Sequence, residues 1–146
     1  MMTITKLKKS ISEQSMVDSF LESSHFKTSR LYTEVPVFSR CVDVVVLNNK
    51  KQISAIEFKR EKWREAIDQV MRVSTSFDYL EICVFKPQHE ELRKDILNTC
   101  SAIGIGVYFI NPTNMKVSKV LKPQKNKNIW KIQKKSVLDY LGDKYQ

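Results

Sequence analysis

Cysteine and histidine are scarce and isolated in this sequence, which excludes several kinds of site. The three cysteines are an odd number, and none stands in the Cys-x-x-Cys or Cys/His spacing of a zinc site. Cys41 and Cys83 fall in expected strands, and Cys100 falls on an expected helix. We therefore expect reduced, buried thiols rather than zinc ligands or disulfides, and we assign no role to His25 or His89.

Long apolar runs, repeats and low-complexity tracts are also missing. No stretch approaches the roughly 20 apolar residues that span a bilayer, and residues 1–12 lack the apolar core of a signal peptide. We therefore expect a cytoplasmic protein without membrane contact. A chain of 146 residues suits a single domain, 1–146, with one hydrophobic core.

Positive charge is in clear excess. The chain has 25 lysines and arginines against 16 acidic residues, which gives a formal net charge of +9. A basic excess of this size indicates an anionic partner, most often nucleic acid.

Two adjacent strands organise the sequence. Residues 41–47 and 52–59 are rich in β-branched side chains, and a turn at 48–51 separates them, which is typical of a β-hairpin. The first strand is apolar on both faces, so we expect it to be buried inside a sheet. Asp43 is out of place there, because a buried carboxylate is costly unless it meets a metal, a cation or hydrogen-bond donors.

Pairing of these strands would bring charged side chains together. Glu57 and Lys59 share a strand face, and Asp43 can lie opposite Glu57. Two carboxylates repel unless a divalent cation lies between them, and Mg²⁺ commonly uses one or two carboxylates. The alternative is a cross-strand ion pair between Asp43 and Lys59, with Glu57 solvated at the strand end.

The motif resembles that of a nuclease family. Asp43, thirteen intervening residues, and then Glu57, Phe58 and Lys59 resemble the PD-(D/E)XK superfamily, which has the restriction-endonuclease-like fold. The chain looks most similar to small members such as archaeal Holliday-junction resolvases and restriction-type enzymes. Val42 stands where proline is frequent, a common variation. The resemblance implies that Asp43 and Glu57 bind Mg²⁺ or Mn²⁺ and that Lys59 positions or activates the attacking water.

The resemblance also suggests two helical residues. Ser10 and Glu13 form a capping box that predicts a helix to about residue 23. A glutamate on the first helix often completes the family's metal site, and Glu13 matches it; a simple capping carboxylate is the alternative. Gln69, on the helix after the motif, matches a glutamine that reaches the active site in several families with this fold. The tyrosine that often follows four residues later is Val73 here.

The order of expected elements fits the same fold. From about Ser10 to Ile110 it is helix, three strands, helix, strand, helix and strand. We expect an α/β protein with an αβββαβ core and a mixed central sheet flanked by helices. The core is about 10–110, and 111–146 is a basic extension with an edge strand at 115–121 and a short helix at 136–141.

Basic residues on either side of the core are candidates for DNA contacts. Lysines spaced by polar residues suit phosphate contacts, which position a protein without reading sequence; a solvated basic surface is the alternative. The expected nucleic-acid-binding residues are Arg40, Arg60 and Arg64 near the motif and Lys125, Lys127 and Lys131 in the extension.

The combined expectation is a metal-dependent endonuclease that hydrolyses DNA and acts as a homodimer. Its catalytic residues are Asp43, Glu57, Lys59 and Gln69, and its metal ligands are Asp43, Glu57 and Glu13. Two alternatives stay open: a non-catalytic DNA-binding module with the same fold, and a resolvase of branched DNA such as Holliday junctions. RNA is also open as a substrate.

Overall fold

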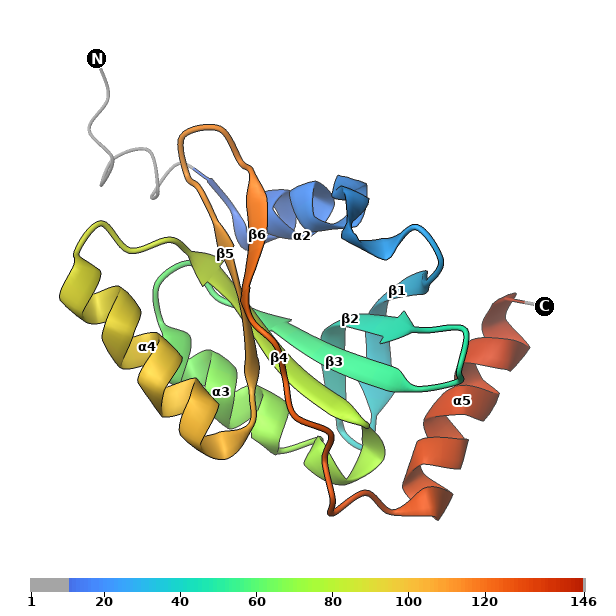
Figure 1. Cartoon of the computed structure of the whole chain (residues 1–146). Helices are drawn as coiled ribbons and strands as arrows, with labels where there is room; N and C mark the ends of the chain where they lie inside the picture. Colours follow the sequence, from blue (N-terminus) through green and yellow to red (C-terminus); the bar gives the residue numbers. More distant parts are fainter. Residues whose placement is uncertain (1–10, 146) are drawn as a thin grey trace.

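A mixed sheet of six strands forms the centre of the computed structural model, which describes residues 11–145 (Figure 1). The N-terminal half contains α2 (Glu13–Glu22), the 3-10 turn η1 (Ser24–Phe26), β1 (Arg30–Val37), β2 (Arg40–Leu47), β3 (Ile53–Phe58) and α3 (Trp63–Met71). The C-terminal half contains the 3-10 turn η2 (Ser74–Ser76), β4 (Tyr79–Phe85), α4 (Glu90–Ile103), β5 (Gly106–Ile110), β6 (Val117–Leu121) and α5 (Lys131–Tyr145).

The strands lie in the order β1-β2-β3-β4-β5-β6. The pairs β1–β2 and β2–β3 are antiparallel, the pairs β3–β4 and β4–β5 are parallel, and the pair β5–β6 is antiparallel. Parallel strands carry helical crossovers on the sheet faces, so they are buried on both sides and read as nearly continuous apolar runs. The expected α/β class with a mixed sheet flanked by helices is confirmed.

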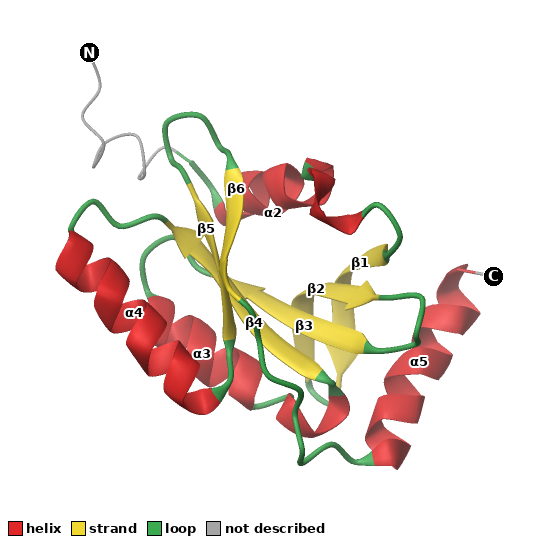
Figure 2. Ribbon diagram, in the orientation of Figure 1, coloured by secondary structure: helices red, strands yellow, loops and turns green. Residues whose placement is uncertain are grey.

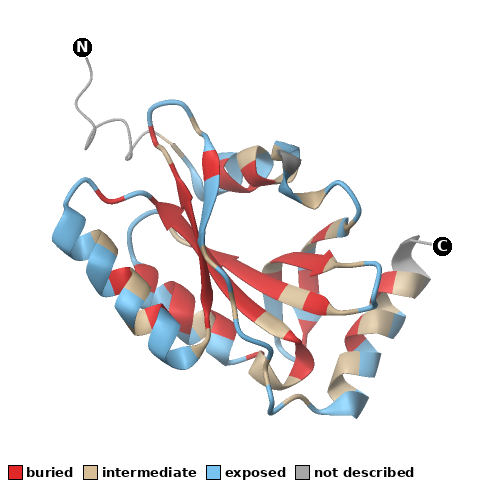
Figure 3. Cartoon of the chain, in the orientation of Figure 1, coloured by how far each residue is buried: buried red, intermediate tan, exposed pale blue. Residues whose placement is uncertain are grey.

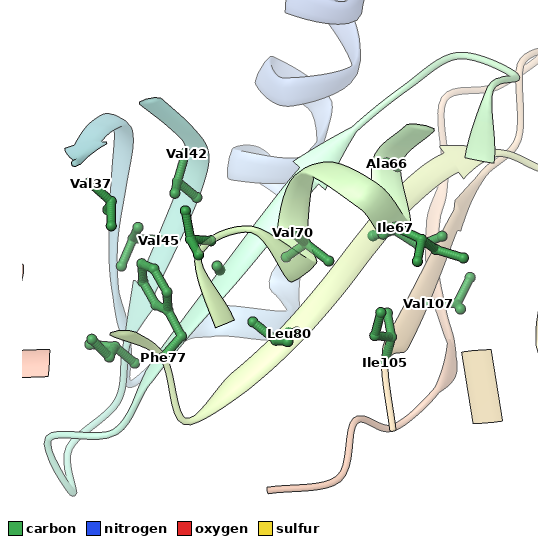
Figure 4. Close-up of a cluster of buried hydrophobic side chains, with 14 of the residues drawn as sticks. Val37, Val42, Val45, Ala66, Ile67, Val70, Phe77, Leu80, Ile105 and Val107 are labelled. Atoms are coloured by element: carbon green, nitrogen blue, oxygen red, sulfur yellow. The ribbon is translucent and has the colours of Figure 1, made fainter. Parts of the chain in front are cut away.

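Helices cover both faces of the sheet (Figure 2). On one face, α3, α4 and α5 contribute side chains such as Val70, Ile96 and Val137 to the larger hydrophobic cluster, part of which is shown in Figure 4. On the other face, α2 packs Met16 and Phe20 against the smaller cluster. The described part of the expected basic extension therefore supplies both an edge strand and a core-packed helix.

Burial follows this layering (Figure 3). β3, β4 and β5 are almost entirely buried, whereas β6 is mostly exposed. β1 lies at the other edge of the sheet, where Pro36 removes no central ladder bond, as its sequence predicted. Gly104 ends α4 in the left-handed conformation, with φ 77°, also as predicted.

The turn between β2 and β3 fixes which residues of these strands face each other. The Asn48 side chain accepts backbone hydrogen bonds from Lys50 and Gln52, and Lys51 adopts a positive φ of 59°. This turn pairs Leu47 with Ile53 and Val44 with Ile56. The same register, continued by one residue, would place Asp43 opposite Glu57.

Two expected helix boundaries were wrong. The N-cap of α2 is Ser12, whose hydroxyl accepts a hydrogen bond from the Ser15 backbone N–H, and Glu13 is the first helical residue. Ser10, the expected cap, lies outside the described residues. The sequence offers two possible N-caps, Ser10 before Glu13 and Ser12 before Ser15, and Ser12 is the one that caps the helix.

The expected short helix at 136–141 is longer and begins at Lys131. Tertiary contacts explain its extra turns. The Gln133 side chain accepts a hydrogen bond from the Thr75 hydroxyl, and Lys134 Nζ lies 2.9 Å from Oδ2 of the buried Asp78. A local sequence pattern does not show contacts to distant residues, so the polar residues 131–135 were not expected to be helical.

Within residues 11–145, no helix is both long and apolar enough to cross a membrane.

Candidate functional site

The antiparallel pair β2–β3 opens at one end. Its pairing stops at Val44 and Ile56, whereas β3 remains paired with β4 as far as Phe58. At the opening, Asp43 Oδ2 accepts a hydrogen bond of 2.8 Å from the Phe58 backbone N–H. The carboxylate thus satisfies an amide that the strand separation leaves without a ladder partner. Asp43 and Glu57 consequently sit next to each other at the mouth of the opening.

A cleft of about 380 Å³ forms at this opening. Its walls come from β2, β3 and the turn before β2, from the start of α2, and from α3. The lining residues are Glu13, Ser39, Arg40, Cys41, Asp43, Glu57, Phe58, Lys59, Gln69 and Val73. The structure therefore gathers all four expected catalytic residues, the third expected metal ligand and one expected phosphate-binding arginine.

Glu57 is buried in this cleft, with a relative exposure of 5 %. Burial raises the pKa of the Glu57 carboxyl from 4.5 to about 9, and the neighbouring Asp43 charge and a hydrogen bond to Asp43 add to the rise. Lys59 acts in the opposite direction but is outweighed. At neutral pH the metal-free site therefore holds a proton on Glu57, at a position where a cation could replace it.

Lys59 follows β3 directly, and its backbone N–H donates to the Cys83 carbonyl over 3.1 Å. Its ammonium lies 4.0 Å from Glu13 Oε1 and 3.8 Å from Glu65 Oε2. Among the residues that the structure describes, these are the ion pairs of Lys59, so the alternative pair with Asp43 is not formed. Both partners are about half exposed, so each pair is weakly stabilising.

Comparison with known proteins gives a fold but no family. No family model matches the chain, and a search of curated proteins finds no match. A protein of unknown function from Silicibacter pomeroyi has a similar solved structure, with a TM-score of 0.68 and 16 % sequence identity. The likeness covers 92 % of this chain and 87 % of that one. The two proteins share a fold. At this identity the likeness says nothing further about activity.

Glu13 and Gln69 reach the cleft from opposite faces of the sheet. Glu13 is the first residue of α2, and Gln69 is a half-buried residue of α3. Val73 is buried and forms an apolar part of the wall. Within the described range, no group of three or more His, Cys, Asp or Glu side chains is arranged to hold a metal ion. The candidate metal site is therefore the pair Asp43 and Glu57, with Glu13 at the rim beside Lys59.

Some cleft residues were missed or misjudged from the sequence. Cys41 was expected to be buried, but it is exposed and lines the cleft, whereas Cys83 and Cys100 are buried as expected. Strand alternation puts Cys41 on the same side as Asp43, a signal that could have placed it there. Glu65 was missed as a partner of Lys59, because their contact joins two separate elements.

The three arginines expected near the motif differ in their positions relative to the cleft. Arg40 lines the cleft, but Arg60 and Arg64 are exposed residues outside the lining set. The Arg64 guanidinium lies 4.2 Å from the centroid of the Trp63 ring, and its Nη2 is 3.7 Å from Asp95 Oδ2. Arg40 is thus the arginine best placed to meet a phosphate in the cleft.

The expected basic residues of the extension lie at the far end of the sheet. Lys125 and Lys127 are exposed, and Lys131 is the first residue of α5. Between them, the Asn126 backbone N–H donates to the Asp78 carbonyl over 2.7 Å, just before β4 begins. The cleft is at the opposite, C-terminal end of the parallel β3. A strand of six residues separates the two ends, about 20 Å.

Asp43 should have a structural role that depends on its oxygen and not on its charge. Asp43→Ala removes the acceptor of the buried Phe58 N–H, so we expect the free energy of unfolding to fall by about 1–3 kcal/mol. Asp43→Asn keeps an acceptor oxygen and removes a charge beside Glu57, so it should be at least as stable as wild type. Urea denaturation in EDTA measures both. Equal losses in the two variants, or no loss in either, would contradict this role.

Proposed function

We propose that this protein is a Mg²⁺- or Mn²⁺-dependent nuclease of the PD-(D/E)XK superfamily that hydrolyses phosphodiester bonds in DNA. The observation that carries the proposal is the meeting of Asp43, Glu57 and Lys59 in one cleft, at the point where β2 and β3 separate. The order from α2 to β4 (helix, three strands, helix, strand) supports a restriction-endonuclease-like core.

The donor set fits a hard divalent cation. Asp43 uses Oδ2 for the Phe58 amide, and Glu57 holds a proton that it would release to a cation. Mg²⁺ takes oxygen ligands and commonly one or two carboxylates, so these two residues would hold it, with Glu13 as a further carboxylate at the rim. A bound divalent cation supplies charge stabilisation at a phosphate and lowers the pKa of water.

The other cleft residues have roles that follow from their positions. Arg40 is exposed at the cleft and can bind a phosphate by donating two parallel N–H···O hydrogen bonds. The Lys59 ammonium, partly buried between Glu13 and Glu65, can orient the attacking water or neutralise charge that develops on the phosphoryl oxygens. The Gln69 side-chain amide can hold the water or a phosphate oxygen from the α3 side.

A cleavage assay tests the proposal directly. Wild type and Asp43→Asn are incubated with linear, nicked, single-stranded and branched DNA and with RNA, each with Mg²⁺, Mn²⁺ or EDTA. We expect wild type to cleave at least one DNA with metal and none in EDTA, and the variant to be inactive although folded. Preference for branched DNA would identify a resolvase. Binding without cleavage under every condition would instead identify a non-catalytic DNA-binding module.

The lysines of the extension are expected to add salt-dependent affinity. For wild type, the logarithm of the DNA association constant should fall linearly with the logarithm of salt concentration, by about 0.9 per neutralised phosphate. Reversal of charge at Lys125, Lys127 and Lys131 should make that slope shallower. Fluorescence anisotropy in EDTA, over a range of salt concentrations, measures both slopes.

A matched triple variant separates contact from net charge. Lys27, Lys86 and Lys94 are exposed residues outside the extension, and their reversal changes net charge equally. If the extension contacts DNA, the salt dependence of binding should become shallower only in the variant with Lys125, Lys127 and Lys131 reversed. Equal changes in both would show that overall charge, not this surface, governs binding.

A further inference from the structure

Phe38 has an environment that neither folding nor core packing explains. It occupies a two-residue turn between Val37 and Arg40, which pair with each other as the last residues of β1 and the first of β2. Its φ is 59°, in the left-handed region that hairpin turns normally fill with glycine or asparagine. Its side chain is 66 % exposed. A large aromatic residue therefore sits at a strained, solvent-facing position where glycine would fit without strain.

This turn is also part of the cleft wall. The next three residues, Ser39, Arg40 and Cys41, all line the cleft that contains Asp43. Phe38 thus stands at the rim, two residues from Arg40, which lines the cleft. Strained backbone conformations cluster at ligand-binding sites, so the positive φ of Phe38 beside the cleft indicates a role in binding.

The neighbouring charges indicate what the ring contacts. Proteins hold single nucleic-acid strands by combining a cation on the backbone with an aromatic ring that stacks on a base. Arg40 and Phe38 provide these two groups on one turn. A base inside an intact duplex is already stacked, so a ring can reach its face only by unstacking a base step, which costs free energy. An unpaired or flipped-out base offers its face without that cost.

We propose that Phe38 stacks on an unpaired nucleobase next to the phosphate held in the cleft, so that the preferred substrate is a single-stranded, branched or otherwise locally unpaired DNA. This inference rests on the proposed function for the position of the phosphate. It narrows the substrate class, because a fully paired duplex exposes a base face to the ring only at the cost of unstacking.

Binding measurements in EDTA test the stacking without requiring cleavage. Truncation of an aromatic side chain that stacks on a base lowers the affinity for the nucleic acid by roughly 5- to 150-fold. We expect Phe38→Gly to lose affinity by this factor for a single strand and to bind duplex of the same sequence as wild type does. Because glycine relieves the positive φ, the variant should melt at or above the wild-type temperature. Phe38→Trp should bind both DNAs as wild type does.

Two further readouts keep the outcome decisive. A single strand carrying 2-aminopurine should lose fluorescence on binding wild type and Phe38→Trp but not Phe38→Gly. Ile103→Ala serves as the control, since Ile103 is an exposed apolar residue, 47 % exposed, at the end of α4 and outside the cleft lining. It should leave the preference for single strands unchanged.

Several results would overturn the stacking role. They are no quenching with wild type, equal losses of Phe38→Gly on single strands and duplex, or an unchanged affinity of Phe38→Gly. The nuclease proposal can fail separately. If wild type binds the single strand and quenches 2-aminopurine but never cleaves DNA, the stacking proposal stands and the nuclease proposal fails. If wild type and Phe38→Gly both cleave paired and unpaired DNA equally well, the nuclease proposal stands and the stacking proposal fails.

Discussion

Lys59→Ala is expected to lower the single-turnover cleavage rate roughly 100- to 1,000-fold while leaving DNA affinity nearly unchanged. The ammonium lies in the cleft with Asp43 and Glu57. If it stabilises charge that develops only as the phosphate is attacked, its removal affects the transition state and not the bound ground state. Loss of one such electrostatic donor typically has this effect on the rate.

The same variant should fold almost normally. Lys59 pairs with Glu13 at 4.0 Å and with Glu65 at 3.8 Å, and both carboxylates are about half exposed. Exposed pairs of this kind contribute about 0–1 kcal/mol to stability, and their loss leaves no buried charge unpaired. Thermal melting and cleavage are therefore measured on one preparation, so that a slow rate cannot be attributed to unfolded protein.

Lys62→Ala is the matched control for Lys59→Ala. Lys62 lies 3.8 Å from Glu65 through the other carboxylate oxygen, is 76 % exposed and does not line the cleft. It removes the same charge from the same partner, so it should melt like Lys59→Ala and cleave at the wild-type rate. A Lys59→Ala protein that melts early and still cleaves at the wild-type rate would reject the catalytic role.

The proximity of Asp43 and Glu57 follows from local sequence. The turn at 48–51 is short and has an asparagine at its first position, so it fixes the strand register, and that register, continued one residue past Val44 and Ile56, brings Asp43 next to Glu57. Alternation along β3 then sets Lys59 on the side of Glu57. Turn chemistry and a period of two residues are both local properties, which is why a single sequence can reveal them.

Features that depend on distant parts of the chain could not be predicted in this way. β2 and β3 separate after Val44 and Ile56, and the Asp43 carboxylate accepts the hydrogen bond of the freed Phe58 amide; the strand pattern of the sequence does not show where this separation occurs. The exposure of Cys41 depends on where the sheet ends. The partnership of Lys59 with Glu65 depends on how α3 packs beside the cleft. The aromatic Phe38 gave no periodic signal, and only its backbone angle and exposure distinguish it.

Glu57→Gln should abolish cleavage and, at high pH, stabilise the metal-free protein. The substitution removes a ligand from the two-carboxylate site. Because a catalytic cation contributes several kcal/mol of transition-state stabilisation, we expect a rate loss on the order of a thousandfold or more. Mn²⁺ should raise the melting temperature of wild type, since it binds only the folded state, and leave that of the variant unchanged.

The pH dependence of stability follows from the raised pKa of this buried carboxyl. The pKa of Glu57 is raised from 4.5 to about 9, so between these values the folded protein keeps a proton that the unfolded chain releases. The corresponding stability is complete below about pH 4.5 and is lost as pH rises through about 9. The amide that replaces the carboxyl in Glu57→Gln cannot titrate and can still donate to Asp43. As the pH rises from about 4.5 to 9, the free energy of unfolding of Glu57→Gln should therefore increase relative to that of wild type, as measured by urea denaturation in EDTA.

Glu81→Gln provides the control that separates burial from catalysis. Glu81 is 3 % exposed, lies on β4 outside the lining of the cleft, and has a pKa that burial raises. Its substitution should change stability with pH in the same direction and leave cleavage and the Mn²⁺ response intact. If Glu57→Gln also kept both, the carboxyl pair would be structural, and the nuclease proposal would lose the residues on which it depends.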